Sequence, residues 1–123
     1  LKLKETSNLQ AEAFSSAEVA HGPMTLVGEG DPVLVLAPLD IARTGLRARR
    51  EDCAARGANV IAAGLPEDVA PASLVLPMDT QVHPVLGAIA QIQSFYGLAN
   101  ALSLARGCDP DSPPHLNKVT RTL

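Results

Sequence analysis

Three short apolar runs lie in the middle of the chain, at residues 32–37, 59–63 and 73–77. The first is continuous rather than alternating and lies between the turn-forming segment 28–31 and Pro38. Continuous apolar runs are typical of strands that are buried on both faces, as in parallel sheets. The sequence therefore predicts three strands of a parallel sheet.

Helical patterns fill the segments that follow these runs. A charged helix is predicted over residues 41–56, with Asp40 as its N-cap and Gly57 at its end. A long helix is predicted over residues 83–106, because apolar residues recur there at helical spacing. Its apolar stripe consists of Val85, Leu86, Ile89, Ile92, Tyr96, Ala99 and Leu102.

Two shorter helices are predicted before the first strand. Residues 1–10 alternate apolar and polar positions at helical spacing. The second helix is expected to begin with Ser16 as its N-cap and Glu18 in its first turn, and Gly22-Pro23 interrupts it. Residues 65–72 and the proline-rich tail are expected to form loops.

Alternation of strands and helices with short connections predicts an α/β fold, in which a parallel sheet lies between helices in a three-layer α/β/α arrangement. The chain begins without Met and inside a helical pattern. We therefore expect residues before Leu1, including at least one strand on the N-terminal side of the sheet, to be missing. We interpret residues 1–123 as one incomplete domain.

Composition narrows the class of function. A net charge of −3 and a pI near 5.5 argue against nucleic-acid binding. Only 2% of the residues are aromatic and none is Trp, so few side chains are available for nucleobases to stack on. No apolar run of membrane-spanning length or leader occurs, so we expect no membrane partner and a cytoplasmic protein. Cys53 and Cys108 show no metal or redox spacing, and we expect both to be reduced, with no metal or cofactor.

Two strings of residues carry candidate chemistry. The first runs from Lys2-Leu3-Lys4-Glu5 through Ala11-Glu12-Ala13-Phe14 to His21-Gly22-Pro23, and the second is the tail 109–120, which contains Lys118. A carboxylate, a histidine and lysines are what aldose–ketose chemistry needs. The imidazole can move the ring-opening proton, the carboxylate can carry the proton between C1 and C2, and a lysine can neutralise charge or form a Schiff base.

Both strings resemble the isomerase part of glucosamine–fructose-6-phosphate aminotransferase and its relatives, which are built from sugar isomerase (SIS) domains. The likeness covers nearly the whole chain and is to the C-terminal SIS domain of a protein with two such domains. It implies a flavodoxin-type α/β/α fold. The resemblance also implies that the phosphate-cradling Ser/Thr loop lies in a first SIS domain. Residues 1–123 contain no Ser/Thr-rich loop of that kind.

The resemblance also assigns roles to four residues. Lys2 and Glu5 match the pair that helps to move the proton between C1 and C2, and His21 matches the histidine that opens the sugar ring. In the aminotransferases this histidine reaches the active site of the neighbouring subunit. Lys118 matches the tail lysine that engages the sugar carbonyl.

Simpler interpretations stand beside these roles. The alternative for Glu5 and Lys118 is a solvated charge, Lys4 competes with Lys2, and a histidine before Gly-Pro, such as His21, is often structural. Two further histidines, the arginines of the charged helix and two glutamates are expected at the surface or in supporting positions: His83, His115, Arg43, Arg47, Arg49, Arg50, Glu12 and Glu18.

The function predicted first is a phosphosugar isomerase, aminotransferase or deaminase that acts on sugars of the glucosamine-6-phosphate and fructose-6-phosphate type. The resemblance does not choose among these three reactions. The alternative is a non-catalytic module that binds phosphosugars in a regulator, and a structural dimerisation domain is a third. The expected partners are a sugar phosphate and either an identical subunit or an N-terminal SIS half.

Overall fold

The computed structural model describes residues 1–39, 43–64, 74–79 and 81–114, and it divides into two compact units. One unit comprises residues 1–13 together with the chain from Tyr96 onward, and the other comprises Phe14–Phe95.

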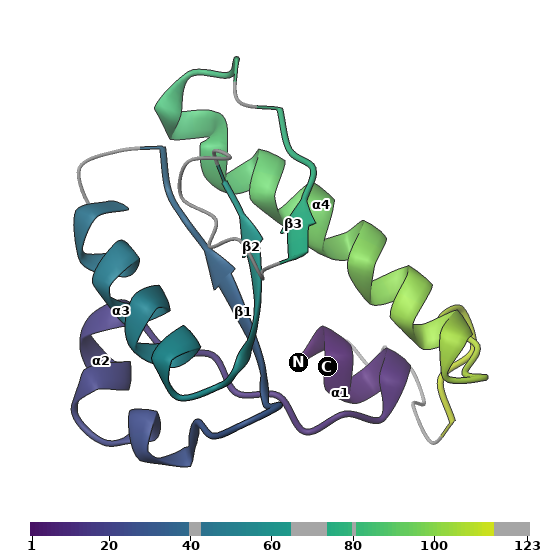
Figure 1. The fold of residues 1–123 in the computed structure, drawn as a ribbon. Coiled ribbons are helices and arrows are strands. Elements are labelled where there is room, and N and C mark those ends of the chain that lie inside the picture. The colour runs from purple at the N-terminus through teal and green to yellow at the C-terminus, as the bar shows by residue number, and fades with distance from the viewer. Residues whose placement is uncertain (40–42, 65–73, 80, 115–123) are drawn as a thin grey trace, which may run out of the picture. The chain divides into compact units, whose positions relative to one another are not determined.

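The larger unit is built on a parallel sheet (Figure 1). Strands β1 (Pro32–Leu36), β2 (Asn59–Ala63) and β3 (Leu74–Leu76) pair in this order, with Val33 opposite Val60 and Ala62 opposite Val75. All three predicted strands are confirmed, and so is their parallel direction. The third is shorter than the predicted run 73–77.

Helices cover the sheet on two sides. Helix α3 (Arg43–Ala55) packs on β1 and β2, and the first part of α4 (Pro84–Ala105) runs along the other side (Figure 1). From α4, Gln91 donates a hydrogen bond to the carbonyl of Ala37 and Ser94 donates one to the carbonyl of Pro77. The predicted α/β/α layering is confirmed.

Small aliphatic and sulfur-containing side chains form the core between α3 and the sheet. Met24, Cys53 and Val60 are buried there, and Val33 and Val35 of β1 pack against them. Residues 33 and 35 lie on the same face of β1 because side chains alternate along a strand. An aliphatic core was expected from a chain with few aromatic residues, and Met24 and Cys53 add two sulfur-containing side chains to it.

Two glycines allow close approaches that a larger residue would obstruct. Gly57 follows α3 with φ 82°, and a Cβ there would lie 3.2 Å from Glu29. Gly87 is buried on α4, where a Cβ would lie 3.2 Å from Leu39. Gly57 is the helix end that the sequence predicted; the predicted cap Asp40 lies outside the described residues.

The N-terminal helices are shorter than predicted. Helix α1 spans Lys2–Ser7, and Asn8 ends it in the left-handed conformation with φ 50°. Helix α2 spans Ser16–Ala20 and is followed by a short 3₁₀ helix, η1 (Pro23–Leu26).

The predicted N-cap of the second helix was wrong by one residue. Ser15, rather than Ser16, accepts a hydrogen bond from the backbone N–H of Glu18, and the Glu18 carboxylate accepts one from the Ser15 N–H. This reciprocal capping box requires the cap to lie three residues before the glutamate, which selects Ser15.

Candidate functional site

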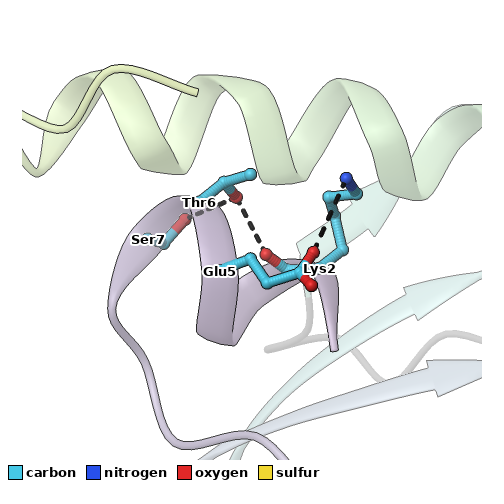
Figure 2. Close-up of polar contacts among 4 residues, drawn as sticks. All are labelled: Lys2, Glu5, Thr6 and Ser7. Atoms are coloured by element: carbon cyan, nitrogen blue, oxygen red, sulfur yellow. Dashed lines mark hydrogen bonds and ion pairs between the residues drawn. The ribbon is translucent and has the colours of Figure 1, made fainter. Parts of the chain in front are cut away.

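Helix α1 carries Lys2 and Glu5 one turn apart (Figure 2). Lys2 Nζ lies 3.9 Å from Glu5 Oε2, and the side chains of Lys2 and Glu5 are 48% and 25% exposed. Residues three apart lie on the same face of a helix, so this proximity follows from the sequence spacing. The arrangement provides a half-buried carboxylate beside a cation.

Lys4 has a different partner. Its Nζ donates a hydrogen bond of 2.6 Å to Glu12 Oε1. This hydrogen bond, together with the charge of Lys4, lowers the pKa of the Glu12 carboxyl. Of the two candidate lysines, Lys2 is therefore the one paired with Glu5, and Glu12 is engaged in holding Lys4.

The C-terminal end of α1 is held by α4 within the smaller unit. Ser103 Oγ donates a hydrogen bond of 2.6 Å to the carbonyl of Thr6, and Arg106 Nε donates one of 2.8 Å to the carbonyl of Ser7. Sequence reasoning missed these two residues. A signal was available for Ser103, which follows Ala99 by four residues on the apolar stripe of the helix.

His21 lies at the C-terminal cap of α2, in the larger unit, and its side chain is exposed. Its backbone N–H donates to the carbonyl of Glu18 at 3.0 Å. Within the described part of the chain its imidazole ring has no hydrogen-bond partner. The ring is thus accessible for proton transfer to a ligand.

Two of the residues singled out in the sequence, Lys118 and His115, lie outside the described residues. The remaining histidine has a structural contact: His83 Nδ1 accepts a hydrogen bond of 3.3 Å from the backbone N–H of Val85, at the start of α4. The predicted structural or surface role of His83 is confirmed.

The chain is similar in sequence to curated aminotransferases from several organisms. The chain is 38% identical over 119 residues to the glutamine–fructose-6-phosphate aminotransferase [isomerizing] of Bacillus subtilis (strain 168), covering 96% of this chain and 19% of that protein. The corresponding enzyme of Thermococcus kodakarensis is 36% identical over 118 residues, which are 96% of this chain and 20% of that enzyme.

Two solved structures share the fold. The C-terminal domain of glucosamine-fructose-6-phosphate aminotransferase from Francisella tularensis superposes with a TM-score of 0.79 at 28% identity, over 88% of this chain and 31% of that one. A Silicibacter pomeroyi structure described as a phosphosugar isomerase gives 0.74 at 39% identity, over 89% of this chain and 32% of that one. The resemblance to the SIS-domain isomerase part of the aminotransferases is confirmed.

No protein-family model matches the chain. The chain spans about a fifth of the length of the aminotransferases that it matches. The similarity therefore extends to the C-terminal isomerase domain of these enzymes and not to the rest of their length.

The side chains of three arginines of α3 are described, that of Arg43 is not, and the three divide into two kinds. Arg47 Nε pairs with Glu51 at 3.0 Å and Arg49 Nη1 with Asp52 at 3.1 Å, which confirms the predicted solvated face. Arg50 contradicts that prediction, because it is 6% exposed and its Nε has no hydrogen-bond partner among the described residues. Arg50 precedes Cys53 by three residues and so shares the helix face that packs on the sheet.

A pocket of about 440 Å³ lies between η1 and α3, with Thr25, Arg49, Asp52 and Arg56 among its lining residues. Arg49 already pairs with Asp52, and Arg56 Nη1 donates to the carbonyl of Met24 at 3.1 Å. The charged side chains that line this pocket therefore already have partners within the protein.

The two cysteines are free thiols, and burial raises the pKa of Cys53. Over the described ranges, no group of three or more His, Cys, Asp or Glu side chains could hold a metal ion. The helices in the same ranges include none that is both long and apolar enough to cross a membrane.

Proposed function

We propose that this chain supplies the proton-transfer groups of an enzyme that interconverts a ketose 6-phosphate and an aldose or amino-aldose 6-phosphate. The observation that carries the proposal is the Lys2–Glu5 pair on α1, in a chain similar to isomerizing aminotransferases and to a protein described as a phosphosugar isomerase. The proposal covers isomerase, aminotransferase and deaminase versions of one reaction centre.

Each residue has a role that its chemistry allows. Glu5 accepts the proton from the carbon next to the carbonyl and returns it to the neighbouring carbon. Lys2 places a positive charge beside this carboxylate and the developing enediolate. The half-buried position of Glu5 supports its role, because partial exclusion of water strengthens both interactions.

His21 and Lys118 complete the proposed set. The exposed imidazole of His21 donates a proton to the ring oxygen when the cyclic sugar opens. Lys118 engages the carbonyl of the open sugar, either by charge or as a transient Schiff base. Both roles extend the resemblance to residues that lie away from the Lys2–Glu5 pair in the sequence.

Glu5→Gln in the intact native protein tests the proposal. The amide keeps the shape of the side chain but cannot accept the proton, so solvent deuterium incorporation at C1 or C2 should fall about a hundredfold to ten-thousandfold. Incorporation is followed by NMR, and binding of fructose 6-phosphate is measured by calorimetry and should change little.

Glu51→Gln is the matched control, because Glu51 is also a helical carboxylate paired with a cation. It should exchange deuterium at the normal rate. Normal incorporation by Glu5→Gln would rule out Glu5 as the base. If the native protein binds the sugar phosphate but catalyses no exchange, the regulatory module would be the correct function.

A further inference from the structure

The carbonyl end of α1 depends on donors from outside the helix. The last carbonyls of a helix have no partner within it, so those of Thr6 and Ser7 are satisfied by groups outside α1. The groups that donate to them therefore act on the orientation of this end of α1 and of the side chains on it.

The donors come from the last turn of α4 and from Arg106, the residue that follows this helix. Ser103 donates to the carbonyl of Thr6 and Arg106 donates to the carbonyl of Ser7, from positions 97 and 99 residues away in the sequence. Thr6 Oγ1 also donates to the carbonyl of Lys2 at 2.9 Å, which links the two ends of the helix.

The hydrogen bond from Ser103 to the Thr6 carbonyl is shielded from water, and that from Arg106 to the Ser7 carbonyl is partly shielded. Ser7 and Ser103 are 0% exposed and Thr6 is 7% exposed. A buried carbonyl that loses its donor is costly, so the geometry of these bonds is strongly enforced. Thr6 directly follows Glu5 in the chain (Figure 2), so the enforced carbonyl belongs to the residue next to the proposed base.

We propose that Ser103 and Arg106 are positioning residues for the reaction, which act through the carbonyls of Thr6 and Ser7 to fix the Glu5 carboxylate. This inference rests on the proposed function. Neither side chain needs to touch the substrate. Their effect is to keep α1 in one orientation, because small misplacements of a catalytic group reduce rates steeply.

Ser103→Ala in the intact native protein tests the first contact. We expect kcat for deuterium exchange at C1 or C2 to fall about tenfold or more, since misplacement by about 1 Å can cost on the order of a hundredfold. KM should change less than about twofold, because binding energy from the rest of the sugar phosphate is unaffected. Hydrogen exchange of the peptide 1–7, followed by mass spectrometry, should become faster.

Ser94→Ala is the matched control. Ser94 lies on the same helix and donates to a backbone carbonyl, that of Pro77, in the other unit. It should leave both kcat and the exchange of peptide 1–7 unchanged. Equal effects of the two substitutions, or no effect of Ser103→Ala on peptide 1–7, would overturn the inference.

Arg106 provides a second test that does not depend on Ser103. Arg106→Met should reduce kcat as Ser103→Ala does, and Arg106→Lys should restore part of it because a lysine keeps one charged donor. Arg47→Met, which removes an exposed arginine paired with Glu51, should have no effect. Failure of Arg106→Met to lower kcat would count against this contact.

A double-mutant cycle separates positioning from general support of the fold. In a Glu5→Gln background, Ser103→Ala should have almost no further effect on the residual exchange, because the group that it positions is already lost. An undiminished effect would show that Ser103 does not act through Glu5. Full exchange by Glu5→Gln alone would instead overturn the proposed function, and the positioning role with it.

Discussion

At the scale of single residues, the two nearby lysines Lys2 and Lys4 have different carboxylate partners. Lys2 and Lys4 are two positions apart and point to different faces of α1, because only residues three or four apart share a face. Lys4 meets Glu12 at 2.6 Å, whereas Lys2 lies 3.9 Å from Glu5. The Lys2 side chain is 48% exposed, so its ammonium is accessible to a ligand while it stays beside Glu5.

Lys2→Met and Lys4→Met should therefore differ. Loss of the positive charge beside Glu5 should reduce deuterium exchange at C1 or C2 on the order of a hundredfold, while Lys4→Met should remain within about twofold of the native rate. NMR titration supplies the control, because the pKa of Glu12 should rise toward its ordinary value only in Lys4→Met. Equal losses of exchange would contradict the distinction.

His21 allows a test that separates two proton transfers. His21→Asn should slow turnover of a cyclic sugar phosphate by about a hundredfold or more and leave an open-chain analogue nearly unaffected, since only ring opening needs the imidazole. The two substrates are compared by steady-state kinetics. If both were slowed equally, His21 would have a structural role instead.

At the scale of secondary-structure elements, local hydrogen bonds determine where helix α2 begins. Helix α2 has five residues, yet its N-terminus is closed by a complete capping box. It places Val19 against the buried cluster of Met24, Cys53 and Val60. The cap therefore stabilises the core as well as the helix.

Ser15→Ala should lower the free energy of unfolding by about 0.5–2 kcal/mol, the usual cost of losing an N-cap hydroxyl. Ser16→Ala is the control, because Ser16 is the first helical residue and not the cap. Its effect should be much smaller. Urea unfolding measures both, and a larger loss for Ser16→Ala would contradict the assignment.

The same cap predicts a pH dependence. Hydrogen bonds from the backbone N–H and then the hydroxyl of Ser15 lower the pKa of Glu18 below its ordinary 4.5. A lowered folded-state pKa gives stability that is present above the unfolded-state pKa and is lost as the pH falls through the folded-state value. The stability difference between native protein and Glu18→Gln should thus disappear on acidification, and a difference that grew would contradict it.

At the scale of the whole molecule, α4 carries an uncovered apolar stripe. Val85 is 77% exposed, Ile89 67% and Ile92 42%, at positions four and three apart on one face of the helix. The sequence predicted these residues as an apolar stripe, but the described residues leave much of it open. Contiguous exposed apolar surface of this kind marks interaction sites, which supports the expected association.

Ile89→Glu tests the association, with Ala48→Glu, which adds the same charge at an exposed position of α3, as the control. If an identical subunit covers the stripe, the mass of the native protein by light scattering should fall in Ile89→Glu alone. If another part of its own chain covers it, the mass should stay and the unfolding temperature should fall by several degrees. No change in either quantity would contradict an interface at this stripe.

The strands, the end of α3 at Gly57 and the Lys2–Glu5 spacing were predictable, because each depends on residues close together in the sequence. The parallel direction of the sheet was predictable from the alternation of strands and helices. Short-range patterns report which faces are apolar and which residues share a helix turn. The resemblance of the two terminal strings added the kind of domain, and it named roles that composition could not supply.

Only the tertiary structure decided what distant segments do to each other. It paired Ser103 with a carbonyl 97 residues away, buried Arg50, and paired Lys4 with Glu12. A serine in a helical stripe is compatible with core or surface, because its hydroxyl can be satisfied by water or by a buried carbonyl. Which of these occurs depends on how α1 and α4 pack, and local sequence patterns do not encode that packing.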